Sequence, residues 1–148
     1  MKLGMQLEII VESEIRSTED ESKVLKAITN FFDAEKIEVL DSGGSKVVVA
    51  TSSNVLSLSK LHRALRVERI LDAARNAMKR GIKGSIIVFH LHKQAAYVGR
   101  LSFVDGDHES PLGSIRITIR CNDPQSIIDW LAPPTSKGKP LWEREAPI

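Results

Sequence analysis

Two stretches, one near each end of the chain, alternate between apolar and polar side chains. In residues 5–14 an apolar side chain recurs at every second position from Met5 to Val11, mostly with glutamate or glutamine between. Residues 114–121 repeat the pattern, with three isoleucines and a cysteine separated by Arg116, Thr118 and Arg120. Alternation of this kind predicts half-buried β-strands, because successive side chains of a strand point to opposite faces. A sheet made of such strands has one face that helices must cover.

Residues 55–80 have a helical pattern whose apolar side does not stay in one direction. Leu58, Leu61 and Leu65 define one stripe, and the stripe from Val67 to Met78 lies more than about 90° away at about 100° per residue. One straight helix cannot bury both stripes. We therefore expect two helices, at 55–65 and 67–80, with a break near Arg66.

The remaining elements follow from caps and turns. Thr18 and Glu21 form a capping box that predicts a helix from there to about residue 33. Gly81 ends the second central helix. Asp123 followed by a proline starts the last helix, and the prolines at 133–134 end it.

Further strands complete a two-layer arrangement. Residues 36–41 and 46–50 flank Gly43 and Gly44, which favour a hairpin turn. Residues 85–92 form a buried strand, followed by a short helical turn at 93–98. The order predicts an α+β two-layer sandwich, a mostly antiparallel sheet with helices on one face. We expect one domain over residues 1–148, with an extended tail from about residue 133 that Leu141 and Trp142 dock.

Charge is segregated along the chain. Residues 46–100 contain eleven bases and two acids, although the whole chain has a formal net charge of only +2. A basic middle third predicts a polyanionic partner. The alternative is a solvated surface that pairs with the acidic N-terminal segment. The predicted nucleic-acid-binding residues are Lys60, Arg63, Arg66, Arg69, Arg75, Lys79, Arg80, Lys83, Arg116 and Arg120.

The aromatic content narrows the class of nucleic acid. Proteins that bind single-stranded nucleic acid stack its bases on exposed aromatic rings. The few aromatic residues of this chain mostly occupy core-like positions. Contacts with the phosphates and 2′-hydroxyls of structured RNA fit better. Gly81-Ile82-Lys83-Gly84 has the G-x-x-G form of the KH-domain clamp. That clamp lies between two helices, whereas the residues after Gly84 have the pattern of a strand, so a helix cap and turn is favoured.

A metal site is the alternative hypothesis to RNA binding. His90 and His92 share one face of a strand, and four nearby residues could add ligands for a divalent ion that activates water. The alternative for the acidic residues is an ordinary turn. The candidate ligands are His90, His92, Asp105, Asp107, His108 and Glu109. No catalytic motif is present, Cys121 is expected to be a buried inert thiol, and no cofactor is implied.

Several longer motifs resemble a known family. They are residues 61–75, 92–105 and 109–113, Asp129-Trp130-Leu131-Ala132-Pro133 and Pro140-Leu141-Trp142. Together they resemble an archaeal family of uncharacterised proteins labelled as predicted RNA-binding, exosome-type subunits. The resemblance implies a fold similar to that of the fifth large-subunit ribosomal protein, and it transfers no catalytic residue.

Three functional hypotheses follow. The first is a non-catalytic RNA-binding module that contacts structured RNA through a basic helical surface. The second is a homodimeric interaction or scaffold protein that uses the sheet face or an edge strand. The third is a metal-dependent hydrolase. No apolar run approaches the roughly 20 residues of a membrane span, and with a single cysteine and no signal peptide the expected location is the cytoplasm.

Overall fold

A computed structural model describes residues 6–105 and 113–147. Within them, seven strands form one sheet in the order β2-β3-β1-β7-β5-β4, with β6 also paired to β5. Every pairing in this sheet is antiparallel. The strands are β1 (Leu7–Ile15), β2 (Lys36–Ser42), β3 (Ser45–Ser52), β4 (Ile82–Lys83), β5 (Ile86–His92), β6 (Phe103–Val104) and β7 (Ser114–Cys121).

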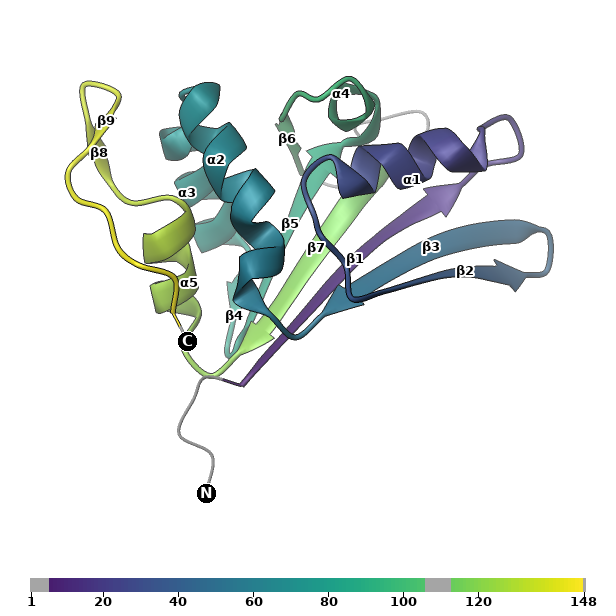
Figure 1. Ribbon diagram of the computed structural model, residues 1–148, viewed down its shortest axis with the longest axis horizontal. Coiled ribbons are helices and arrows are strands. Elements are labelled where there is room, and N and C mark those ends of the chain that lie inside the picture. The colour runs from purple at the N-terminus through teal and green to yellow at the C-terminus, as the bar shows by residue number, and fades with distance from the viewer. Residues whose placement is uncertain (1–5, 106–112, 148) are drawn as a thin grey trace.

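The helices cover one face of this sheet (Figure 1). They are α1 (Glu21–Thr29), the short 3-10 turn η1 (Val55–Leu58), α2 (Ser59–Val67), α3 (Leu71–Arg80), α4 (Lys93–Tyr97) and α5 (Pro124–Leu131). The core lies between the two layers, where Val11 of β1 and Ile117 of β7 are buried with Leu65 of α2. The predicted α+β two-layer sandwich is confirmed. None of the helices in the described part of the chain is long and apolar enough to cross a membrane.

Helix α1 differs from its prediction at both ends. It begins after Asp20, whose side chain accepts a hydrogen bond from the Ser22 amide at 2.9 Å, so the predicted Thr18 cap is wrong. The helix also ends at Thr29 and not near residue 33. Phe31 and Phe32 are buried all the same, because the chain carries them into the core just beyond the helix.

The central segment is divided into two helices, as predicted, but the break lies further along. Helix α2 continues through Val67, and Arg69 then adopts a positive φ of 57°. The Ile70 amide donates to the Leu65 carbonyl at 3.1 Å, which closes a Schellman-type end. Val67 points away from the core with 74% of its surface exposed, so its predicted place in the buried stripe is wrong.

Gly81 ends α3, as expected. A glycine at a helix end usually adopts a left-handed backbone conformation, but Gly81 does not. Its φ is −92°. A Cβ at this position would lie 1.8 Å from the carbonyl oxygen of Val88, so the glycine permits two backbones to approach. The segment from Gly81 to Gly84 leads into the β4–β5 hairpin. It is therefore a helix end and turn, and not a loop between two helices as in a KH domain.

The C-terminal tail contains a small hairpin of β8 (Thr135–Ser136) and β9 (Lys139–Pro140). Leu141 is 60% exposed, so the expectation that it docks the tail is wrong. Glu143 instead pairs with Arg66 of α2, and Ala146 packs against the core.

Candidate nucleic-acid interface

The basic residues of the central segment divide into an internal and an outward set. Among the described residues, six of the eleven bases in residues 46–100 form ion pairs, and every partner comes from outside that segment. The pairs are Lys46–Glu21, Lys60–Asp33, Arg66–Glu143, Arg75–Asp129, Arg80–Asp105 and Lys93–Glu19.

Arg66 joins α2 to the end of α5 and to the tail. Its Nη1 donates to the carbonyls of His62 at 2.8 Å and Leu131 at 3.0 Å, and its Nη2 donates to the Trp130 carbonyl at 3.2 Å. The same guanidinium forms a forked pair with Glu143 at 2.9 and 2.6 Å. Its positive charge lies among the last carbonyls of α5, where a cation is favoured. Arg66 is therefore a structural residue as well as a predicted RNA contact.

Arg75 has a similar role on α3. Its Nη1 donates to Asp129 and to the Ala132 carbonyl, both at 3.0 Å. Gln125 also donates to Asp129, at 2.9 Å. Since the Arg75–Asp129 pair is largely buried, it binds α3 to α5 and contributes little to the outer surface.

Five bases of the central segment face solvent with no hydrogen bond or ion pair from their side chains to the rest of the described chain. They are Arg63, Arg69, Lys79, Lys83 and Arg100. Lys60 and Arg80 have partners, but their side chains are half or more exposed and the Arg80–Asp105 distance is long, at 3.8 Å. Exposed pairs of this kind contribute about 0–1 kcal/mol, so a phosphate could replace the carboxylate.

Arg116 and Arg120 lie on the opposite side of the sheet from α2 and α3. They alternate along β7 with the buried isoleucines, and so occupy the face that no helix covers. Arg116 pairs with Glu12 at 3.0 Å and Arg120 with Glu8 at 2.9 Å, each across the β1–β7 ladder. The ten predicted residues therefore do not form one continuous surface.

The candidate metal ligands are dispersed where the structure describes them. His90 lies on the uncovered face of β5, opposite Arg116. His92 caps α4, and its Nδ1 accepts a hydrogen bond from the Ala95 amide at 3.2 Å. Asp105 faces Arg80. Asp107, His108 and Glu109 lie outside the described residues, and within those residues no group of three histidine, cysteine, aspartate or glutamate side chains could hold a metal.

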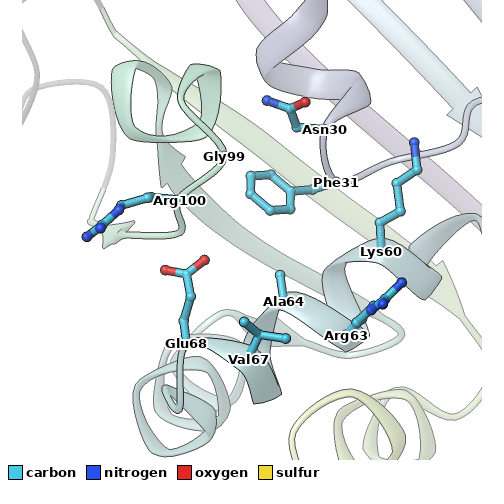
Figure 2. A pocket seen from close by; sticks show the side chains of 9 residues that line it. All are labelled: Asn30, Phe31, Lys60, Arg63, Ala64, Val67, Glu68, Gly99 and Arg100. Carbon is cyan, nitrogen blue, oxygen red and sulfur yellow. The ribbon is translucent and has the colours of Figure 1, made fainter.

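A cavity of about 610 Å³ opens between α2, the end of α1 and the turn after α4. Figure 2 shows the Phe31 ring in the middle of this cavity, with Lys60 and Arg63 to one side and Arg100 at the opposite rim. The cavity thus combines an apolar floor with basic edges. Its lining residues are Asn30, Phe31, Lys60, Arg63, Ala64, Val67, Glu68, Gly99 and Arg100.

Hydrogen bonds fix the walls of the cavity. Lys60 of α2 donates to the Thr29 carbonyl at the end of α1, at 3.0 Å. Asn30 donates through Nδ2 to the carbonyls of Ala96 and Tyr97, at 2.8 and 3.2 Å. The Glu68 carboxylate accepts the Leu101 amide through both oxygens, at 3.1 Å. The three segments are therefore held at fixed separations before any ligand binds.

Sequence reasoning missed Arg100 and Phe31 as site residues. Arg100 lies 17 residues beyond the basic cluster that ends at Lys83, and Phe31 belongs to the acidic N-terminal third. Only the packing of α1 and α4 beside α2 brings them together. A signal was present for Arg100, which is the last of the eleven bases in residues 46–100.

Where α2 contacts α5, His62 stacks on Trp130 with ring centroids 4.9 Å apart. Burial, reinforced by the nearby Arg66 charge, lowers the pKa of His62 below its ordinary value. The hydrogen bond from Arg66 likewise lowers the pKa of Glu143. At neutral pH the cluster therefore contains a neutral imidazole and an ion pair, and it adds no free cation to the surface.

Comparisons with known proteins agree on one family. A family model described as RNA binding matches residues 8–121. A UPF0201 protein of Sulfurisphaera tokodaii is 55% identical over 139 residues, covering 94% of this chain and 96% of that protein. A UPF0201 protein of Aeropyrum pernix is 54% identical over 143 residues, covering 96% and 95%.

Solved structures show the same fold. The crystal structure of a UPF0201 protein from Methanococcus jannaschii matches with a TM-score of 0.76 and 31% identity, covering 90% of this chain and 98% of that one. A DUF54 protein from Methanothermobacter thermautotrophicus matches with a TM-score of 0.59 at 18% identity, covering 84% of this chain and 94% of that one. At this identity the match shows a shared fold alone. The chain belongs to the archaeal UPF0201 family, whose matching model is described as RNA binding.

Proposed function

We propose that the chain is a non-catalytic RNA-binding module that contacts structured RNA through the outward bases of α2, α3 and β4. The observation that carries this proposal is the RNA-binding family model over residues 8–121. It is supported by four exposed bases of the predicted set that have no partner in the described chain: Arg63, Arg69, Lys79 and Lys83. Lys60 and Arg80 join them by exchanging weak surface pairs for phosphates.

The placement of the aromatic rings supports structured RNA over single strands. Phe31, Phe32, Phe89 and Trp130 are buried, so they offer no open platform on which successive bases could stack. Lysine and arginine side chains on helices instead suit the phosphates that line an A-form duplex, whose deep groove excludes side chains.

The family resemblance extends the proposal to the protein's context. An exosome-type subunit would meet RNA in the cytoplasm as part of a larger assembly. A fold like that of the fifth large-subunit ribosomal protein would serve this role, since a sheet with helices on one face leaves a helical surface free for RNA. Isolation of the native complex, followed by identification of its protein and RNA components, tests both statements.

The direct test is a salt titration of binding to a labelled RNA hairpin. The logarithm of the affinity should fall linearly with the logarithm of the salt concentration, and Arg63→Glu/Arg69→Glu should reduce the slope by about 2, one unit for each lost phosphate contact. The matched control is Lys137→Glu/Lys139→Glu, which makes the same charge change on the β8–β9 hairpin. A slope near zero, no binding at low salt, or an equal effect of the control would contradict the proposal.

A second candidate function is homodimerisation through β2. This strand lies at the edge of the sheet, and it contains three large hydrophobic residues that are exposed, Ile37, Val39 and Leu40. Such an edge can pair with the same edge of another copy. Light scattering of the wild type and of Val39→Lys tests this: a dimer that the substitution dissociates, together with no affinity for RNA, favours the second candidate over the first.

A further inference from the structure

The cavity beside α2 has the size and the apolar wall that a nucleobase requires. Its volume of about 610 Å³ lies within the roughly 300–1,000 Å³ typical of small-molecule pockets. Phe31 and Ala64 form its floor. Val67 is 74% exposed at its mouth, where an aliphatic side chain gains nothing from facing water. Phe31 is only 6% exposed and supplies little open surface, so a flat base would lie against Val67 and Ala64 and cover the exposed Val67 side chain.

The rim has the charge that a phosphate requires. Arg63 of α2 and Arg100 after α4 lie at opposite rims of the cavity with their guanidinium groups directed outward (Figure 2), and both are exposed with no partner in the described chain. A guanidinium binds phosphate oxygens through two parallel hydrogen bonds, so each arginine can hold a backbone phosphate beside the cavity. The Lys60 ammonium already binds Asp33 and the Thr29 carbonyl, and it is not required.

Two acceptors complete the set of polar groups. Asn30 uses its Nδ2 on the carbonyls of Ala96 and Tyr97, which leaves Oδ1 available as an acceptor. The Glu68 carboxylate is oriented by the Leu101 amide and keeps lone pairs free. Ribose 2′-hydroxyls and exocyclic base amines are donors that such acceptors can bind, and the 2′-hydroxyl distinguishes RNA from DNA.

We propose that this cavity binds one unpaired nucleotide extruded from a structured RNA, with its base against Ala64 and Val67 and its phosphates held by Arg63 and Arg100. The inference rests on the proposed RNA-binding function and adds the RNA feature that is recognised. The hydrogen bonds across all three walls hold the cavity open, so that binding requires little reorganisation.

The test compares two RNA hairpins of the same stem sequence, one fully paired and one with a single bulged adenosine, by fluorescence anisotropy at one salt concentration. Wild-type protein should bind the bulged RNA about tenfold more tightly, the order of effect expected from removing one exposed valine side chain from water. Val67→Gln should reduce this preference to within about twofold and leave affinity for the paired hairpin unchanged, because it alters the cavity wall without changing charge. Leu141→Gln, at another exposed aliphatic residue, should retain the full preference.

A second variant tests the phosphate contact. Arg100→Gln should weaken binding of the bulged RNA more than of the paired RNA, since Arg100 lies at the cavity and outside the α2–α3 surface. Equal binding of both hairpins by the wild type overturns the nucleotide pocket and leaves the proposed function standing. Binding of neither hairpin overturns the proposed function itself. A preference that survives both Val67→Gln and Arg100→Gln means that the bulge is recognised elsewhere, and the inference is wrong.

Discussion

The contacts of Arg66 make replacement by alanine the most informative single perturbation of stability. The guanidinium bonds three backbone carbonyls and one carboxylate, and it connects α2, α5 and the tail. Alanine keeps the helix but removes all of these contacts. The carbonyls of Trp130 and Leu131 at the end of α5 then lose their donor.

The size of the effect follows from the exposure of each contact. A net value of about 1 kcal/mol for each of the three carbonyl hydrogen bonds, and about 0.5 kcal/mol for the partly exposed pair with Glu143, gives an upper limit near 3.5 kcal/mol. Water reaches some of the freed carbonyls when the tail opens, so the expected loss is about 2–3 kcal/mol. For a chain of this length that corresponds to a fall in Tm of roughly 5–10 °C.

Urea and thermal denaturation of Arg66→Ala and Arg63→Ala measure the difference directly. Arg63 lies three residues earlier on the same helix and is exposed without a partner in the described chain, so its removal should change the free energy of unfolding by less than about 0.5 kcal/mol. The Arg66 variant should also become more sensitive to proteolysis within the tail. Equal stability of the two variants would refute the structural role of Arg66.

Three further outcomes are expected. Lys93 and Glu19 form a buried ion pair at 3.0 Å, so Lys93→Met should cost about 3–5 kcal/mol in urea denaturation, and adding Glu19→Gln should recover at least half because no unpaired charge remains. Gly81→Ala should cost about 1–3 kcal/mol, since its Cβ would overlap the Val88 carbonyl, and an unchanged midpoint would contradict the close approach. Because the pKa of His62 is lowered from 6.5, the unfolded chain binds its proton more readily. Tm should therefore decline as pH falls below about 6.5, and His62→Gln should flatten that part of the profile.

The strands were predictable from local pattern, and their partners were not. The two alternating stretches became β1 and β7, which lie side by side at the centre of the sheet, with Val11 opposite Ile117 and Glu12 opposite Arg116. Alternation determines which face of a strand is buried. The alternating pattern does not indicate which strands will pair across a separation of about a hundred residues, because pairing depends on the packing of the whole sheet.

The central helices show a similar limit. Two apolar stripes at different angles require two helices, and the structure has two. The position of the break depends on Arg69, which has a positive φ. Glycine and asparagine are the residues that usually adopt this conformation, so an arginine gives no sign of it in the sequence. The cavity was hidden for the same reason, since its walls come from three segments that only the tertiary fold brings together.

The segregation of charge along the chain has two consequences: ion pairs between distant segments, and a basic surface that faces outward. The sequence alone does not show which bases contribute to which. Six bases of the central segment use acids from the flanking thirds as partners, so separating the charges along the chain provides ion pairs between distant segments once it folds. The outward field is therefore weaker than the composition of residues 46–100 indicates, and it depends mainly on the five bases that remain unpaired in the described chain. Arg63 and Arg66, less than one helical turn apart, fall into different sets. Replacing Arg63 should weaken RNA binding at unchanged stability, and replacing Arg66 should reduce stability first, so this pair of variants separates the two consequences.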